Sequence, residues 1–274
     1  MIARILHVSD LHMGKREDAE VERALAALVE RTAPELVVAS GDLTNRGRRA
    51  EHERAHRFLG SLGVPVLAVP GNHDLPYTFP ARFASPWAEF ERLWETTEPT
   101  YASAGLHVVG LNSAQPYRHQ GGALDDEQLR RAAERLGDAA AGAYRVAVLH
   151  HHLLGAPWRA ARKRPLSSRD RAFEALVSAG ADLILSGHIH QASLAERREF
   201  EAVRGDARAA VVSTAPGFGQ PRPNRLGEAR GLHVYEAGEA SLTVLTYAWC
   251  GDDWELVARR EFPRGLGPLA QTRD

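Results

Sequence analysis

Short apolar runs alternate with stretches whose apolar residues recur every three or four positions through the first two-thirds of the chain. Two of these runs, ELVVASG and LHVVGLNS, are nearly continuous in apolar residues, as strands buried on both faces are. The segments expected as strands are 3–9, 35–41, 64–71, 106–113, 145–151 and 181–187, and those expected as helices are 19–32, 49–62, 125–137 and 168–180. This alternation predicts a mainly parallel or mixed sheet with helices on its faces.

After residue 190 the pattern changes to consecutive strand-like segments joined by glycine-containing turns. One of them, GLHVYEAGEASLTVLTYAW, is typical of a hairpin. Because no long linker separates the two regions, we expect a single domain over 1–274. Within it, 1–190 form a βα part, 191–262 a β-rich part that completes a second sheet, and 263–274 a tail.

Composition narrows the range of functions. The 274 residues can bury a substantial core, and the net charge of −1 gives no general attraction to nucleic acid or anionic lipid. The single cysteine, Cys250, excludes an internal disulfide and fits a reducing compartment. The sequence shows neither a signal peptide nor an apolar segment of the ~18 residues that a membrane span needs. We therefore expect a cytoplasmic protein with no membrane partner and no strong nucleic-acid signal, its oligomeric state left open.

Five of the expected strands end in residues that bind metal ions. In chain order these blocks are Asp10-Leu11-His12, Gly41-Asp42, Gly71-Asn72-His73-Asp74, His150-His151-His152 and Gly187-His188-Ile189-His190. Ligands of open α/β sheets bind at the carboxyl ends of the strands, where all five blocks would meet. Each block alone has an ordinary explanation as a turn, a helix cap or a surface pair. Five in succession, each directly after an apolar run, indicate a shared metal site.

In this order the blocks resemble the motifs of the calcineurin-like metallophosphoesterase superfamily: Asp-x-His, Gly-Asp, Gly-Asn-His-Asp/Glu, His and Gly-His-x-His. The resemblance spans residues 10–190. The sequence LNS at 111–113, followed by GGALDDEQLRRAAERL, is also similar to a segment common in the branch of bacterial cyclic-nucleotide phosphodiesterases. The resemblance implies an α/β fold, a four-layer α/β/β/α sandwich of two mixed sheets flanked by helices.

The resemblance also implies two divalent metal ions held by side chains from all five blocks. One ion would take Asp10, His12, Asp42 and His190, and the other Asp42, Asn72, His188 and one histidine of the triplet. Asp42 would bridge the two ions, as two-metal hydrolysis requires. A mixture of carboxylate, imidazole and amide ligands suits Mn²⁺, Fe or Zn²⁺ better than Mg²⁺ or Ca²⁺.

The histidine triplet leaves one ligand open. Family members often read His-x-Pro here, with the first histidine as ligand, whereas Leu153 stands in place of that proline. On this ground His151 is favoured over His150. His152 would then either contact substrate at the mouth of the pocket or pack away from it.

The third block carries the implied catalytic residues. His73 resembles the family's catalytic histidine, which assists the leaving oxygen or stabilises the transition state. Asp74 would orient His73 through a hydrogen bond. A hydroxide that bridges the two metals would attack phosphorus in line. We therefore expect a dinuclear metal-dependent phosphoric ester hydrolase.

The substrate has to be inferred from weaker features. The segment 155–170 should overhang the site, where Trp158 could stack on a base and Arg159 and Arg162 could hold a second charged group. A solvated basic loop is the ordinary alternative. The compact length and the LNS segment favour a phosphodiesterase acting on a small phosphoester, with a cyclic nucleotide as the candidate.

Three other functions remain open. A nuclease is one, because SDLHMG also resembles the superfamily's DNA-repair exonucleases, although those carry a large extra DNA-capping region. A phosphomonoesterase of the same superfamily is another. A metal-free scaffold on this fold is the third, but such proteins lose ligands and this sequence retains them all. A lipid-precursor pyrophosphatase is disfavoured, since that branch usually has Arg where His73 stands.

Overall fold

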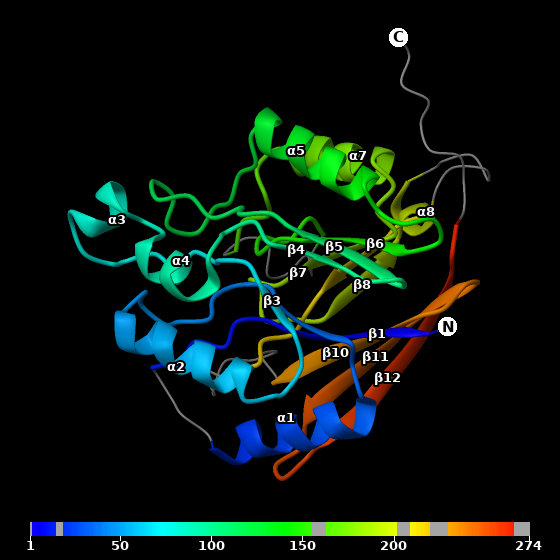
Figure 1. Cartoon of the computed structure of the whole chain (residues 1–274), viewed down its shortest axis with the longest axis horizontal. Helices are drawn as coiled ribbons and strands as arrows, with labels where there is room; N and C mark the ends of the chain where they lie inside the picture. Colours follow the sequence, from blue (N-terminus) through cyan, green and yellow to red (C-terminus); the bar gives the residue numbers. More distant parts are fainter. Residues whose placement is uncertain (1, 15–18, 155–162, 202–208, 220–229, 266–274) are drawn as a thin grey trace.

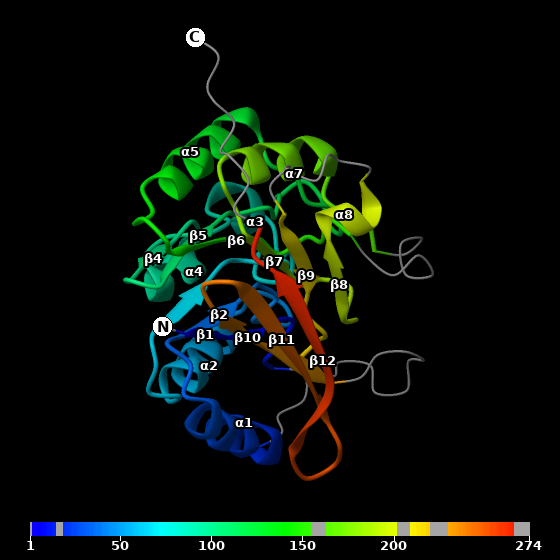
Figure 2. The same ribbon diagram turned by 90° about the vertical axis from the view of Figure 1, so that its right-hand side faces the viewer.

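A computed structural model describes residues 2–14, 19–154, 163–201, 209–219 and 230–265. These residues form two six-stranded sheets that pack face to face, with helices on both outer surfaces (Figure 1). The same four layers are visible after rotation by 90° (Figure 2). The expected fold class, a four-layer α/β/β/α sandwich of two mixed sheets, is confirmed.

The first sheet has β1 near its centre. Its strands, in spatial order, are β12 (Trp254–Pro263), β11 (Ser241–Trp249), β10 (Gly231–Ala237), β1 (Ala3–Val8), β2 (Leu36–Ala39) and β3 (Val66–Ala68). β1, β2 and β3 are parallel, whereas β10 to β12 form an antiparallel meander. Ile5 of β1 lies between Leu36 of β2 and Tyr235 of β10. The parallel strands therefore end at one common edge.

The second sheet repeats this arrangement with a larger parallel part. Its strands, in spatial order, are β4 (Thr100–Ala102), β5 (Leu106–Gly110), β6 (Tyr144–Val148), β7 (Leu183–Ser186), β9 (Val211–Thr214) and β8 (Ser193–Glu196). The four central strands are parallel, and the edge strands β4 and β8 run antiparallel to their neighbours.

The β-rich part after residue 190 contributes to both sheets. From the sequence we expected residues 191–262 to complete the second sheet. Only β8 and β9 join the sheet of β4 to β7, whereas β10 to β12 join the sheet of β1 to β3. β1 explains the difference. The edge of β1 opposite β2 carries buried main-chain groups that need partners, and β10 pairs with residues 3–7 of that edge.

Three hydrophobic clusters fill the three interfaces between the layers. Successive residues of a strand face opposite sides of the sheet, so Leu36 and Val38 pack between the sheets while Val37 and Ala39 pack under the helices of the first sheet. This double burial accounts for the continuous apolar runs in the sequence.

Helices cover the outer face of each sheet. α1 (Ala19–Thr32), α2 (Arg49–Gly60) and α4 (Ala88–Trp94) cover the first sheet, α5 (Asp126–Gly137) and α7 (Arg169–Ser178) cover the second, and α3 (Ala81–Ala84) and α8 (Arg197–Phe200) are single turns. None of the helices in the described ranges has the length and apolar character needed to cross a bilayer.

Candidate metal centre

All five polar blocks meet where β1, β2, β3, β6 and β7 end. Main-chain hydrogen bonds join the turns: the N–H of Asp10 donates to Gly41 (2.9 Å), that of His12 to Asp42 (2.9 Å) and that of Gly187 to His150 (3.0 Å). The side chains that the structure brings together here are all buried, and they are those of Asp10, His12, Asp42, Asn72, His150, His188 and His190.

The backbone at this site is strained. Five of these residues have φ between 51° and 74°, a region that residues other than glycine rarely adopt, and they are Asp10, His12, Asp42, His188 and His190. Such conformations cost free energy and persist only where the surrounding structure enforces them, which is characteristic of functional sites. The folded chain thus holds these side chains in place at a cost to stability.

Two glycines let the turns approach one another closely. A Cβ atom on Gly71 would lie 2.3 Å from the main-chain nitrogen of Asp42, and one on Gly187 would lie 1.8 Å from Oγ of Ser9. Neither residue has a positive φ, so they are required for close packing. Gly41, with φ of 92°, is the glycine of this group that a tight turn requires.

Three ligand atoms, from Asp10, His12 and His190, converge in a first cluster, and Asp42 approaches it through His12. Nε2 of His190 lies 3.2 Å from Nε2 of His12 and 3.0 Å from Oδ1 of Asp10, and Nε2 of His12 lies 3.9 Å from Oδ2 of Asp42. Two facing Nε2 atoms of neutral rings cannot both carry a hydrogen. At least one of the two therefore presents a lone pair, which a cation could take as a ligand.

A second cluster uses the other oxygen of Asp42. Nε2 of His150 lies 3.3 Å from Oδ1 of Asp42 and 3.2 Å from Nδ1 of His188. Nδ1 of His150 donates to the main-chain oxygen of Ser40 (2.8 Å), so in the neutral ring Nε2 is the unprotonated nitrogen. The Asp42 carboxylate therefore reaches both clusters, one oxygen to each.

The pKa shifts show how much negative charge the site concentrates. Burial raises the pKa of Asp10, but the adjacent His190 outweighs it and the net shift is strongly downward. Burial likewise raises the pKa of Asp42, and His150 outweighs it. Burial lowers the pKa of His150, yet Asp42 raises it to about 9. Both carboxylates are thus ionised in a buried site, where positive charge on the neighbouring imidazoles balances them.

Unpaired polar atoms show that the residues fit metal ions. In the described structure, neither side-chain atom of Asn72 has a hydrogen-bond partner, nor has Oδ2 of Asp42 or Nε2 of His188. Buried polar groups are normally paired because leaving them unpaired is costly. Divalent cations would take Oδ1 of Asn72 and Oδ2 of Asp42 as ligands together with the histidine nitrogens of the two clusters, so the site suits two such ions.

The three histidines of the triplet have different surroundings. Nδ1 of His151 lies 2.9 Å from Oγ of Ser113, and a Cβ atom on Gly122 would lie 2.3 Å from the His151 ring. Nδ1 of His151 therefore faces the segment 113–122, whereas Nε2 of His150 faces Asp42. Leu153, which stands in place of the family's proline, is buried in the cluster under the helices of the second sheet.

His152 does not lie at an open pocket mouth. It is buried, and its ring stacks on that of His188 at 5.7 Å between centroids. Burial lowers the pKa of His152 to about 4, so the ring is neutral near pH 7. Its position behind His188 makes it a support for that ring and not a direct substrate contact.

His73 and Asp74 separate from one another. The His73 ring lies edge-on to His12 at 4.8 Å, and its Nδ1 donates to the main-chain oxygen of Asn45 at 2.8 Å. The Asp74 carboxylate instead accepts hydrogen bonds from main-chain N–H groups of Leu43 (3.2 Å), Thr44 (2.8 Å) and Gly71 (2.8 Å). The prediction that Asp74 orients His73 is therefore replaced: Asp74 ties the turns after β2 and β3 together.

Two contacts of His73 have no counterpart in the motif. One is the Asn45 carbonyl, and the other is the Tyr77 hydroxyl, which lies 3.0 Å from Nδ1 of His73. Every residue type has a main-chain carbonyl, so the sequence does not indicate that this one accepts a hydrogen bond from His73. Tyr77 follows His73 by four residues in an irregular segment, where no periodicity indicates that the two would meet.

The predicted substrate residues Trp158, Arg159 and Arg162 lie outside the described residues. Lys163, the next basic residue of the same segment, is described and is 7% exposed. Burial lowers the pKa of His188, and the nearby charge of Lys163 lowers it further. Lys163 thus brings a cation close to the second cluster.

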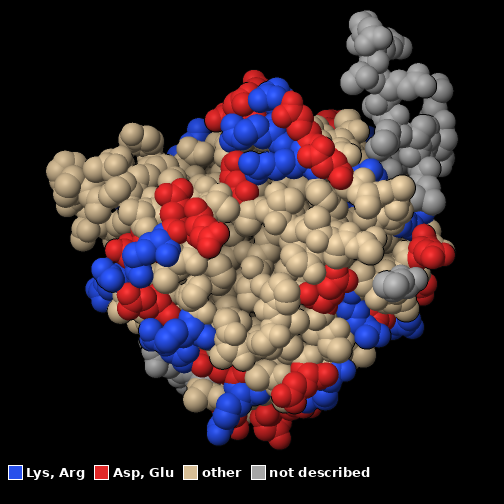
Figure 3. All heavy atoms as spheres, viewed as in Figure 1, with Lys and Arg blue, Asp and Glu red and all other residues tan. Residues whose placement is uncertain are grey.

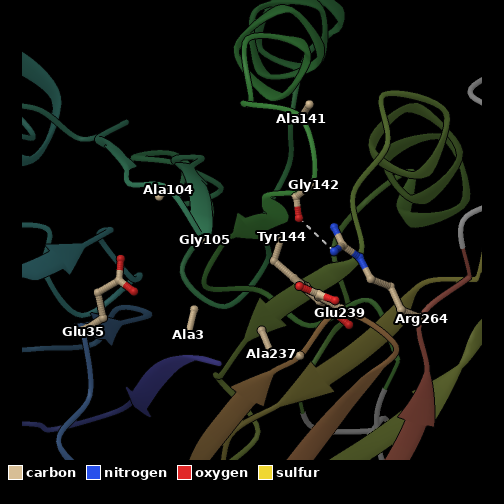
Figure 4. Close-up of a pocket in the computed structure, with 11 residues that line it drawn as sticks. Ala3, Glu35, Ala104, Gly105, Ala141, Gly142, Tyr144, Ala237, Glu239 and Arg264 are labelled. Carbon is tan, nitrogen blue, oxygen red and sulfur yellow. Dashed lines mark hydrogen bonds between the residues drawn. The ribbon is translucent and has the colours of Figure 1, made fainter. Parts of the chain in front are cut away.

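A pocket at the opposite end of the sandwich has about 450 Å³ of volume (Figure 4). Its lining includes Arg264, whose terminal nitrogens donate to Gly142 (2.9 Å) and to Asp182 (3.3 Å) and whose guanidinium lies over Tyr144 at 4.1 Å. None of the predicted site residues lies there. Because the protein itself pairs this guanidinium, the pocket is poorly suited to an anionic phosphoester.

Known proteins similar to this chain include phosphoesterases, and the similarity covers the residues of the metal centre. The model of the calcineurin-like phosphoesterase family matches residues 3–192, which include all five blocks. A probable cyclic nucleotide phosphodiesterase of Synechococcus is 30% identical over 217 residues, 72% of this chain and 77% of the relative. A 3′,5′-cyclic adenosine monophosphate phosphodiesterase of Haemophilus influenzae is 27% identical over 202 residues, 69% of this chain and 70% of the relative.

A solved structure supports the fold independently of sequence. Purple acid phosphatase from yellow lupin, Lupinus luteus, superposes with a TM-score of 0.71 at 10% identity. The match covers 97% of this chain and 54% of the phosphatase. At this identity the likeness concerns the arrangement of sheets and helices.

Proposed function

The chain belongs to the calcineurin-like phosphoesterase family, and from this premise we propose that it is a phosphodiesterase acting on small phosphodiesters, with a cyclic nucleotide as the candidate substrate. It is a metal-dependent phosphoester hydrolase. The observation that carries the proposal is the Asp42 carboxylate, whose Oδ2 lies 3.9 Å from Nε2 of His12 and whose Oδ1 lies 3.3 Å from Nε2 of His150. The names of the two relatives, which extend over two-thirds of the chain or more, favour diesters over monoesters and nucleic acid.

We assign the two ions to the two clusters. One takes Asp10, His12, Asp42 and His190, and the other takes Asp42, Asn72, His150 and His188. His150 thus replaces the expected His151. This mixture of nitrogen and oxygen ligands suits Mn²⁺, Fe or Zn²⁺.

The residues around the ligands prepare the site for hydrolysis. When bound, two divalent ions supply Lewis-acid stabilisation of the phosphate charge and lower the pKa of a water nucleophile. The Ser9 hydroxyl (2.7 Å) and the His188 N–H (2.9 Å) both donate to Oδ2 of Asp10. These bonds direct the other carboxylate oxygen toward His190 and reduce the reorganisation that binding requires.

His73 is assigned to the leaving oxygen. Its Nδ1 hydrogen is held by the Asn45 carbonyl, so proton transfer to substrate falls to Nε2. In the protonated ring, Nε2–H can donate to the oxygen that leaves phosphorus, which is general-acid assistance. The ring's edge-on contact with His12 places it beside the first cluster.

The proposal is tested with the purified full chain. Chelation should abolish hydrolysis of bis(p-nitrophenyl) phosphate, and Mn²⁺ should restore it. Asp42→Ala should lose nearly all turnover, because both clusters depend on its carboxylate, whereas Cys250→Ser, a change at an exposed thiol, should match the wild type. Full activity in chelator or in Asp42→Ala would refute the dinuclear site.

A substrate panel distinguishes the remaining functions. It should contain p-nitrophenyl phosphate, 2′,3′- and 3′,5′-cyclic AMP and single-stranded DNA. Faster turnover of the cyclic diesters supports the proposal. Hydrolysis confined to p-nitrophenyl phosphate would make the protein a phosphomonoesterase, and hydrolysis confined to DNA would make it a nuclease. A protein that binds no Mn²⁺ and hydrolyses none of these substrates would be a scaffold.

A further inference from the structure

Two neighbouring loops beside His73 carry a concentration of aromatic side chains. The loop 76–84, which includes α3, and the loop 114–119 together present exposed Phe79 (84%) and Tyr117 (82%). α3 projects from the body of the molecule (Figure 1). On the face drawn in Figure 3 this projection shows no Lys, Arg, Asp or Glu, in contrast to the helices around it. Exposed aromatic surface of this kind usually marks a contact site.

The two loops are held together. Arg82 donates from Nε to the main-chain oxygen of Pro116 at 2.8 Å and from Nη1 to that of Pro76 at 3.3 Å. The ring of Phe83 stacks on that of Tyr117, with centroids 5.3 Å apart and an angle of 27°. Because these contacts fix the loops before any ligand arrives, binding to them loses little conformational entropy.

The inner end of this surface touches His73. The Tyr77 ring lies 5.8 Å from that of His73 and 5.6 Å from that of His119, to which it is nearly perpendicular at 84°. Tyr77 is 41% exposed. We call Tyr77 and His119 the inner aromatic pair. A planar group bound against this pair would be adjacent to the residue assigned to the leaving oxygen.

The Tyr77 hydroxyl also has a hydrogen to offer. The carbonyl of Asn45 can only accept, so the hydrogen on Nδ1 of His73 points to it, at 2.8 Å. Tyr77 Oη, 3.0 Å from the same nitrogen, can then only accept a share of that N–H. Its own hydrogen is left for an oxygen of the substrate.

We propose that the inner aromatic pair recognises substrates that carry a planar ring on the leaving group of the phosphodiester, such as a nucleobase or an aryl group, with one ring of the pair stacked on the planar group and the nearly perpendicular ring at its edge. The inference rests on the proposed function. Aromatic side chains bind bases through their π-faces without strong sequence preference. Because the pair lies next to His73, which is assigned to the leaving oxygen, the planar ring that it binds belongs to the leaving group. The outer rings of Phe83 and Tyr117 lock the loops.

The test compares planar and aliphatic diesters in metal-loaded protein. Substrates are 3′,5′-cyclic AMP, bis(p-nitrophenyl) phosphate and glycerophosphoethanolamine. Tyr77→Ala should raise KM for the two planar substrates by about 5- to 150-fold, the factor expected for losing one base stack, and leave KM for the aliphatic diester within about 2-fold. His119→Ala should act in the same direction. Tyr77→Phe retains the ring and should restore KM, while losing part of kcat with the hydroxyl.

Phe79→Ala is the matched control, because Phe79 is an exposed residue of the same loop whose ring lies 6.4 Å from that of Phe83 and belongs to the outer part of the surface. It should leave all three KM values unchanged. Equal KM changes of Tyr77→Ala for planar and aliphatic diesters would overturn the inference while the proposed function stands. Absence of diester hydrolysis in the wild type would instead overturn the proposed function.

A second copy of the chain is the competing occupant of this surface. The molecular mass of the wild type and of Tyr117→Ala, measured by sedimentation, distinguishes a second copy of the chain from substrate as the occupant of this surface. A wild-type dimer that dissociates in Tyr117→Ala, with planar and aliphatic KM values changed alike, would assign the surface to association and overturn the inference. An unchanged mass together with planar-selective KM effects supports substrate recognition.

Discussion

Nδ1 of His73 lies 2.8 Å from the main-chain oxygen of Asn45, three residues after Asp42 along the chain. The orientation of this ring is thus set by the backbone of the turn after β2 and not by the carboxylate that follows it. A main-chain acceptor survives every side-chain substitution. Changes at Asp74 and changes at His73 should therefore have different consequences, and the two can be separated by experiment.

His73→Ala should lower turnover without removing metal. The ring is assigned to the leaving oxygen, and general acid–base groups typically supply about 10²–10⁴-fold. Metal content, measured on the purified variant, should match the wild type. The loss in kcat should be larger for a cyclic nucleotide, whose alkoxide needs a proton, than for a nitrophenyl diester. Equal kcat losses for the two substrates would mean that His73 stabilises the transition state electrostatically and donates no proton. Loss of metal from the variant would overturn the assignment of His73 to the leaving oxygen.

Asp74→Asn should act on stability first. An amide in place of one carboxylate oxygen would direct N–H toward main-chain donors of Leu43, Thr44 or Gly71. A buried donor left without an acceptor costs about 1–3 kcal/mol, so urea unfolding should show a loss of this order. An unchanged unfolding free energy together with a turnover loss equal to that of His73→Ala would mean that Asp74 acts through His73 after all.

Separate alanine variants identify the ligand of the histidine triplet. His150→Ala should lose metal from the second site, because Nε2 of His150 lies 3.3 Å from Asp42. His151→Ala should retain both ions, since the His151 ring is paired with Ser113. Metal analysis at fixed protein concentration measures both. The reverse pattern would restore His151 as the ligand.

His233 should make stability depend on pH. Burial lowers its pKa to about 4, against about 6.5 in an unfolded chain. Between these values the unfolded state binds more protons, so the free energy of unfolding falls as pH drops from about 6.5 toward about 4. The largest slope from one such histidine is about 1.4 kcal/mol per pH unit.

The comparison of wild type with His233→Gln isolates this contribution. His233 is hydrogen-bonded to Thr214 (3.3 Å) and Thr246 (3.1 Å), neither of which belongs to the metal site. Urea unfolding at pH 7 and pH 5, with chelator present throughout, should show a smaller pH effect in the variant. Parallel stability profiles would contradict a neutral, buried His233.

The sequence by itself determined the residue types at the strand tips and the alternation of strands with helices, whereas the four layers were implied by the family resemblance. The alternation follows from local patterns: doubly apolar strands such as ELVVASG need cover on two faces, and helical periodicity supplies that cover. Parallel strands end at one edge, so polar blocks placed directly after them had to meet. Asp42 could be named as the shared carboxylate because the family resemblance implied it, and the structure turns its two oxygens toward the two clusters.

Only the tertiary structure decided which way the side chains point. His150 and His151 are adjacent and chemically identical, and their roles differ because Ser113, 38 residues from His151, pairs with one ring and Asp42 faces the other. Asp74 binds main-chain groups of another turn, and β10 takes the open edge of β1 more than 220 residues away. Such choices depend on contacts between segments distant in sequence, and periodicity along the chain reports only which face of its own element a residue occupies.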